Sequence, residues 1–204
     1  MIKPLKDRWT IVIVGKWNVA IFGPKWVSEN VFENKEISLE FPVQPGLPIR
    51  ITSEDILIIP NTDRLVINPT GLNDELVKLA GEKACRILEK LPHTPISMTG
   101  INFAYSIEPI PPEIVSCFRN EKEDAILNAG YKTMAKSLGW HLEKENQILN
   151  LKCELNNELI ISFNFHSITK NSEEAIAAIN NKILIHKKTV EELLTEIYGL
   201  SLEE

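Results

Sequence analysis

Leu91-Pro-His-Thr-Pro-Ile-Ser-Met-Thr-Gly-Ile-Asn-Phe-Ala-Tyr-Ser-Ile-Glu-Pro-Ile110 is the stretch that decides the fold. Pro92 ends the helix before it, because proline lacks a backbone N–H and restricts the residue that precedes it. Apolar residues then alternate with polar ones, at even positions as far as Met98 and at odd positions from Ile101. A strand has a period of two, so this change of phase predicts one long central strand over 95–107, with a bulge at Thr99-Gly100.

The residues before this strand predict several strands followed by a long helix. Residues 9–22 are rich in β-branched and aromatic side chains with Gly15 in their middle, which favours one bent strand or two short ones. Pro24 suits the start of a short helix. Short alternating runs at 37–41, 49–52, 55–59 and 64–67 predict four more strands. Asn73 is a good N-cap, and apolar residues at helical spacing then predict a helix to about Lys90.

The residues after the central strand repeat this order. We expect a helix over 113–129, a strand over 131–142, and two clear strands over 148–155 and 159–165. A three-residue loop at 156–158 pairs Leu155 with Leu159 and keeps both apolar faces together. Asn171 is the expected N-cap of a last, continuous helix that reaches residue 198. Its apolar seam has spacings of three and four: Ile176, Ile179, Ile183, His186, Val190, Leu193 and Ile197.

The sequence therefore predicts an α+β fold of two similar halves, 1–91 and 92–204, which form one compact unit. Each half reads as strand, helix, antiparallel strands and long helix. We expect a curved antiparallel sheet with the helices on one face. The final helix fits packing against this sheet, and the alternative is a coiled-coil-like contact with a partner.

Composition limits the classes of function. The formal net charge is −6, and residues 1–91 hold 12 basic and 12 acidic residues, so the acidic excess lies in the second half. This balance disfavours nucleic-acid binding through a broad basic surface. Three widely spaced cysteines suggest neither a disulfide framework nor a zinc site. With no secretory signal and no long apolar run, we expect a cytoplasmic protein that does not enter a membrane.

No catalytic motif stands out, and we predict no catalytic residue, metal site or cofactor. Two candidate surfaces remain. The first is a polar sheet face that could bind a ligand: His93, Asn102, Ser162, Asn164 and His166. The second is an interface on the last helix: Ile183, His186, Val190 and Leu193. The simpler interpretation of both sets is a solvated sheet face and a buried helix seam.

Two resemblances add to these residues. The order of elements resembles the TATA-binding-protein-like fold, which implies two halves in a saddle-shaped sheet. The runs Leu91-Pro92-His93-Thr94-Pro95, Gly100-Ile101-Asn102-Phe103 and Phe163-Asn164-Phe165, with Ile185-His186, are similar to a sporadically distributed prokaryotic family of unknown function. That likeness implies an accessory protein from a mobile-element or antiviral-defence locus.

We therefore expect a non-enzymatic interaction protein that acts as an oligomer or as a subunit of a larger complex. Its partner would be a second copy of itself or another protein. One alternative is a nucleic-acid-associated module that uses the concave sheet face. The observation behind it is that Phe163 and Phe165 lie on one strand face. A second alternative is an unrecognised hydrolase or nuclease that uses His93 or His166, because histidine titrates near neutral pH.

Overall fold

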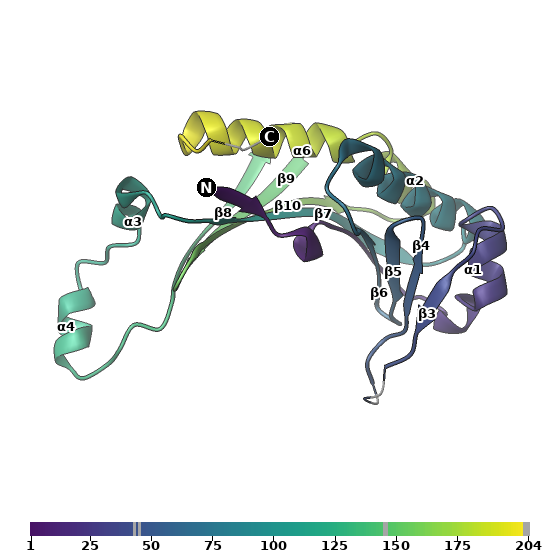
Figure 1. Ribbon diagram of the computed structural model, residues 1–204, viewed down its shortest axis with the longest axis horizontal. Helices are drawn as coiled ribbons and strands as arrows, with labels where there is room; N and C mark the ends of the chain where they lie inside the picture. The colour runs from purple at the N-terminus through teal and green to yellow at the C-terminus, as the bar shows by residue number, and fades with distance from the viewer. Residues whose placement is uncertain (43, 45, 145–146, 202–204) are drawn as a thin grey trace.

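The molecule is built on one arched antiparallel sheet, and most of the helices lie on the convex side of that sheet (Figure 1). The computed structural model describes residues 1–42, 44, 46–144 and 147–201. The strand order is β3-β4-β5-β6-β2-β7-β10-β9-β8, and β1 also pairs with β7. The strands are β1 (Ile2–Pro4), β2 (Thr10–Gly15), β3 (Ser38–Glu40), β4 (Arg50–Ser53), β5 (Ile56–Pro60), β6 (Arg64–Pro69), β7 (Ile96–Ile107), β8 (Lys136–Lys144), β9 (Gln147–Leu155) and β10 (Leu159–Ile168).

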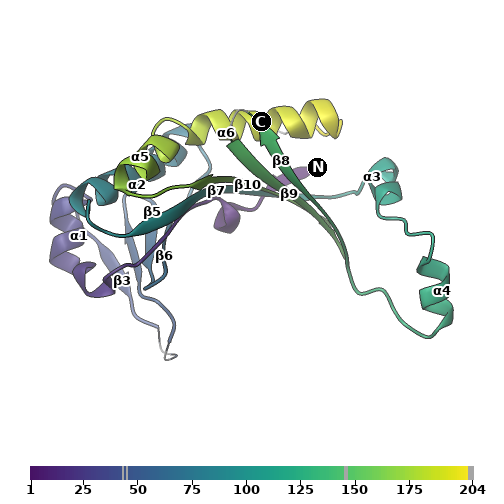
Figure 2. The same cartoon turned by 180° about the vertical axis from the view of Figure 1, so that it is seen from behind.

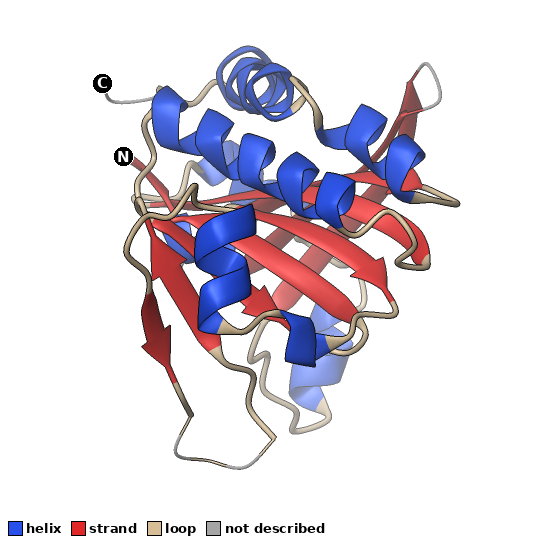
Figure 3. Ribbon diagram, turned by 90° about the vertical axis from the view of Figure 1, so that its right-hand side faces the viewer, coloured by secondary structure: helices blue, strands red, loops and turns tan. Residues whose placement is uncertain are grey.

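The helices are α1 (Pro24–Asn30), α2 (Asp74–Lys90), α3 (Pro112–Cys117), α4 (Glu123–Asn128), α5 (Ser172–Ile179) and α6 (Ile183–Glu192). Short helical turns add η1 (Lys6–Arg8), η2 (Val19–Ile21) and the π-helical η3 (Leu193–Ile197). Seen from behind and from the side, α2, α5 and α6 cover the same face of the sheet (Figures 2 and 3). These observations confirm the predicted α+β class, whereas the two-fold repeat stays a prediction.

β7 is the centre of the sheet, as predicted. It pairs with β10 along one edge, and with β2 and then β1 along the other. The predicted bulge position is wrong: the register with β2 shifts between Val14 and Gly15, opposite Ser97, and is regular at Gly100. At the shift, a Cβ on Gly15 would lie 2.5 Å from the Pro95 carbonyl oxygen. The glycine that permits the irregularity therefore belongs to the neighbouring strand.

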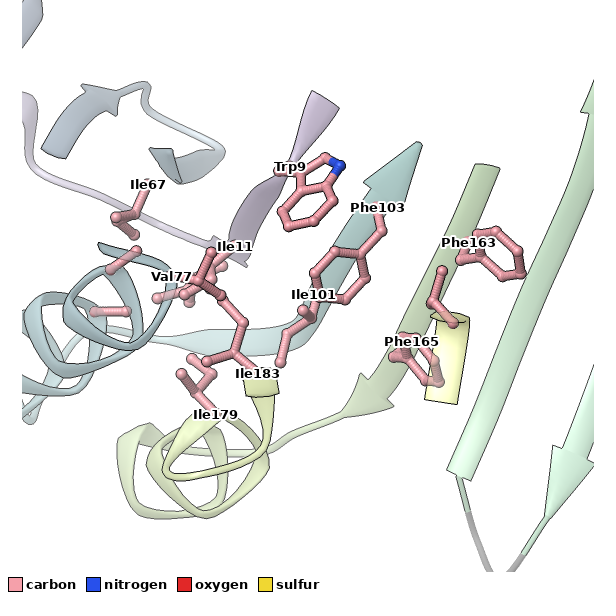
Figure 4. Close-up of a cluster of buried hydrophobic side chains, with 14 of the residues drawn as sticks. Trp9, Ile11, Ile67, Val77, Ile101, Phe103, Phe163, Phe165, Ile179 and Ile183 are labelled. Atoms are coloured by element: carbon pink, nitrogen blue, oxygen red, sulfur yellow. The ribbon is translucent and has the colours of Figure 1, made fainter. Parts of the chain in front are cut away.

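The core lies between the sheet and the three covering helices. Odd-numbered residues of β7 and β10 point toward the helices, and Phe103, Phe163 and Phe165 are buried there (Figure 4). Trp9 packs edge-to-face on Phe103 with ring centroids 5.1 Å apart, and its indole N–H donates to the Ala104 carbonyl at 3.2 Å. Burying such large apolar side chains provides the main driving force for this sheet–helix arrangement.

The α2 helix begins where the sequence predicts. The Asn73 side chain accepts a hydrogen bond from the Leu76 N–H at 2.9 Å, which satisfies one of the unpaired donors at the helix start. Lys83 of α2 is buried and pairs with Glu54 at 3.0 Å. Hydrogen bonding to Lys83 lowers the pKa of the Glu54 carboxyl, so the pair joins α2 to the β4–β5 turn as two charged groups.

The last helix is not continuous, contrary to the sequence prediction. Asn171 caps α5 as expected, accepting from the Glu174 N–H at 2.8 Å. The chain then turns at Asn181, whose φ of 56° lies in the left-handed region that asparagine tolerates better than most residues. Beyond α6, the π turn changes the helical phase. Leu194 is therefore fully buried, whereas Ile197, which the seam placed against protein, is 70% exposed.

The single helix predicted over 113–129 is also wrong. Two short helices, α3 and α4, form an arm that projects from the β8 end of the sheet (Figure 1). Short helices gain little from their own hydrogen bonds and depend on packing. Ile114 of α3 and the following Phe118 are buried, whereas no residue of α4 is buried.

Candidate amide-lined binding groove

A continuous row of polar side chains crosses five adjacent strands on the face opposite the helices. In register, Asn102 of β7 lies between Thr10 and Asn164, and Asn150 of β9 lies between Asn164 and His141. The carboxamides bond in one direction: Asn102 Nδ2 donates to Thr10 Oγ1 at 3.0 Å, and Asn164 Nδ2 donates to Asn102 Oδ1 at 2.6 Å. Asn150 Nδ2 then donates to Asn164 Oδ1 at 2.9 Å.

His141 ends the row, with its Nδ1 2.6 Å from Asn150 Oδ1. An amide oxygen can only accept, so the imidazole Nδ1 carries the hydrogen and donates. We call Thr10, Asn102, Asn164, Asn150 and His141 the amide row. Neighbouring strands are about 4.8 Å apart, so the row spans about 19 Å across the sheet.

Small residues flank the amide row, and on one side of it they leave a hollow in this face. On one side, Ala104 and Ser162 lie opposite each other, and Gly139 lies opposite Lys152. On the other side, a Cβ on Gly100 would lie 2.8 Å from Asn164 Nδ2. Gly100 therefore provides room for the Asn164 side chain to lie along the sheet and reach Asn102.

The hollow is a groove of about 490 Å³, lined by four members of the amide row, Thr10, Asn102, Asn164 and Asn150, and by the η1 turn. Asp7 and Arg8 of η1 stand at one side, and Lys152 of β9 stands at the other. The η1 turn is fixed to the sheet, because Asn68 Nδ2 donates to the carbonyl oxygens of Lys6 at 3.0 Å and of Trp9 at 2.7 Å. The groove thus has one fixed wall, and its lining includes one acidic residue and two basic residues.

Asn164 and Asn150 keep hydrogen-bonding capacity that the row does not use. A carboxamide offers two N–H donors and two acceptor lone pairs. Within the described residues, each of these two side chains donates one hydrogen bond and has one partner at its oxygen. One donor and one acceptor on each are left for a ligand or water, and both side chains are partly exposed in the groove.

The structure brings together three of the five residues predicted for the binding face. Asn102, Ser162 and Asn164 all line the groove. His166 lies one row away, opposite Gly100 and Ile148. His93 lies in the exposed turn between α2 and β7 and does not line the groove.

The predicted helix interface is covered by the protein itself. Ile183, His186 and Val190 are buried, and Leu193 is partly buried against the core, so α6 packs on the sheet. The His186 ring stacks on Phe165 at 4.1 Å between centroids, and Gln147 Nε2 lies 3.0 Å from His186 Nε2. An amide nitrogen can only donate, so Nε2 accepts and the imidazole is neutral. Burial, followed by the charge of Lys182, lowers the pKa of His186 to about 4.

Sequence reasoning missed Thr10, Asn150 and His141. One signal could have found Asn150: the predicted register that pairs Leu155 with Leu159 also places Asn150 opposite Asn164. Thr10 joins the row through the pairing of β2 with β7, which no local turn specifies. His141 joins it through the pairing of β8 with β9.

A scan of known protein-family models found no match to this chain, and a search of curated proteins also found none. The resemblance to a prokaryotic family of unknown function therefore stays a prediction. Among the described residues, no group of three or more histidine, cysteine or acidic side chains is arranged to hold a metal ion. Across the same ranges, no helix combines the length and apolar character needed to cross a membrane.

Proposed function

We propose that this chain is a non-enzymatic interaction protein that binds an extended segment of a partner protein in its amide-lined groove. The observation that carries the proposal is the amide row itself: three carboxamides present donors and acceptors side by side across about 10 Å of sheet, within a row of about 19 Å. Carboxamides neither titrate near neutral pH nor act as nucleophiles, so their chemistry is that of recognition. The accessory role in a larger prokaryotic complex, linked to defence or to a mobile element, follows from the sequence resemblance.

The chemistry of the groove favours a polypeptide main chain as the ligand. Each peptide unit has one N–H and one C=O, which match the remaining acceptor and donor of Asn164 and Asn150. An extended chain rises about 3.3 Å per residue, so about six residues would span the row. Recognition of main-chain groups gives affinity, while Arg8, Asp7 and Lys152 at the sides would select the partner's charged side chains.

A nucleic-acid ligand fits this face less well. Phe163 and Phe165, which motivated that alternative, are buried on the helix side of the sheet, so neither ring can stack on a base (Figure 4). The residues that line the groove include two cations and one anion, which is a weak attraction for a phosphate backbone.

Selection from a random 12-residue peptide library, followed by fluorescence anisotropy of the synthesised peptides, tests the proposal. Asn164→Leu removes the central carboxamide, and we expect it to weaken binding about tenfold, or about 1.4 kcal/mol. The control Asn157→Ala, in the exposed β9–β10 loop, should bind like the wild type. N-methylation of the peptide main chain should abolish binding, whereas single alanine substitutions should have smaller effects.

Three results would overturn the proposal. One is a selection that yields no peptide above background. Another is binding that Asn164→Leu leaves unchanged. The third is tight, steeply salt-dependent binding of single-stranded or duplex nucleic acid in the same groove.

A further inference from the structure

The two edge strands of the described sheet are the three-residue β3 and the longer β8. β8 is last in the sheet order and pairs only with β9 within the described residues. Every residue from Gly139 to Lys144 is exposed. An edge strand of nine residues presents a row of unpaired main-chain N–H and C=O groups, which is a template for pairing with another strand.

An apolar hollow continues from this edge on the helix side of the sheet. Its volume is about 480 Å³, and the β8 residues that line it are Leu138, Trp140 and Leu142. The opposite wall comes from the end of the last helix, including Leu193, Ile197 and Tyr198. Trp140 is 41% exposed and Leu142 is 42% exposed, so the edge carries apolar surface next to unpaired backbone.

The projecting arm brings more exposed apolar surface to the same end of the molecule. Tyr131 is 70% exposed and Met134 is 85% exposed, and both directly precede β8. Ile126 and Leu127 of α4 are also exposed. Large apolar side chains gathered next to a free edge are typical of a protein–protein interface.

The β8 sequence is partly symmetric about Trp140. Leu138 and Leu142 lie two residues to either side of Trp140, and Lys136 and Lys144 lie four residues to either side. In an antiparallel pair centred on Trp140, Leu138 would lie opposite Leu142 of the second copy, and the two Trp140 side chains would meet at the axis. Lys136 would then lie near Lys144 of the second copy, and Glu123, 2.5 Å from Lys136 Nζ, offsets that repulsion.

We infer that two copies of this chain pair through β8 across a two-fold axis at Trp140 and form one continuous sheet. A two-fold contact uses the same surface on both copies, so a single association would cover the apolar edge of each copy. The two apolar hollows would lie next to each other at the axis, where Trp140 and Leu142 of each copy cover apolar surface of the other. No residue of β8 lines the groove, so this contact lies outside the proposed peptide site, and His141 is the member of the amide row nearest the axis.

Light scattering coupled to size-exclusion chromatography tests the inference. We expect wild-type protein to have twice the mass of one chain at micromolar concentration. Trp140→Lys with Leu142→Lys should give a monomer with an unchanged far-ultraviolet circular dichroism spectrum. Ile168→Lys, which changes an exposed isoleucine (72%) at the end of β10, should stay dimeric and serves as the matched control.

A crosslink defines the axis. In a Cys117→Ser background, which removes the exposed native thiol, Trp140→Cys should form a covalent dimer under mild oxidation. Ile168→Cys in the same background should not. A strictly monomeric wild type would overturn the inference. A dimer that survives the double lysine substitution, or one without the Trp140→Cys crosslink, would also overturn it.

Discussion

His186 should make the stability of this fold depend on pH in a way that one substitution can remove. The imidazole is 3% exposed, stacks on Phe165 and accepts a hydrogen bond from Gln147, so the folded protein holds it neutral. Its pKa is lowered from 6.5 to about 4 by burial and then by Lys182. The unfolded chain binds a proton near pH 6.5, so between these two values acidification favours unfolding.

The magnitude follows from this pKa difference. The stability contributed by the neutral imidazole is complete above pH 6.5 and is lost as the pH falls toward 4. At pH 4.5 the loss in the free energy of unfolding is about 2.5 kcal/mol, at about 1.4 kcal/mol per pKa unit. His186→Leu cannot be protonated, and because Gln147 is partly exposed it can bond to water, so we expect near-wild-type stability at pH 7.5.

Urea unfolding of both proteins at pH 7.5 and pH 4.5 measures the effect. Acidification should cost the wild type about 2.5 kcal/mol more than His186→Leu, because the carboxyl groups are common to both. His93→Leu, which changes an exposed turn histidine, is the control and should follow the wild type. If the wild type and His186→Leu lose the same free energy, the folded protein does not hold His186 as a buried, neutral imidazole.

Two further substitutions test the packing of the sheet. Ile183→Asp places a charge in the buried contact between α6 and α2, next to Gly81, and should destabilise the fold by about 4 kcal/mol or more. Its control, Ile185→Asp on the exposed side of α6, should change the stability by no more than about 0.5 kcal/mol. Thermal melts of both variants measure the difference. Gly100→Ala should cost about 1–2 kcal/mol, because the new methyl group meets Asn164 Nδ2 and disturbs the amide row. Gly139→Ala is its control, since the nearest atom is 3.9 Å away, and equal effects of the two alanines would contradict the close packing at Gly100.

The sequence predicts an element well where one face of that element is buried. Residues 148–155 and 159–165 alternate cleanly because one side of β9 and β10 packs under helices, and the pairing of Leu155 with Leu159 confirms the three-residue loop. The helix expected over 113–129 failed, because the arm has little core to hold it and local propensity alone does not fix its length. The break at Asn181 was missed because the apolar spacing continues across it.

The candidate site was only half visible in the sequence. Asn102 and Asn164 were predicted as polar residues on one sheet face, and the structure makes them neighbours. What the sequence did not show is that five strands align in register, because strand pairing depends on contacts that are distant along the chain. The reach of Asn164 to Asn102 also depends on Gly100, whose role appears only when Asn164 lies beside it.

The pairing of β2 with β7, two strands far apart in the sequence, affects how the chain folds during synthesis. β2 leaves the ribosome more than 80 residues before β7, yet it pairs with β7 along its whole length. Until β7 emerges, β2 is an open strand edge that carries Ile11 and Ile13, two side chains that the finished protein buries completely. At translation rates of about 5–20 residues per second, this exposure lasts several seconds. A nascent chain stalled in that interval would be a substrate for chaperones and a risk for aggregation through the β2 edge.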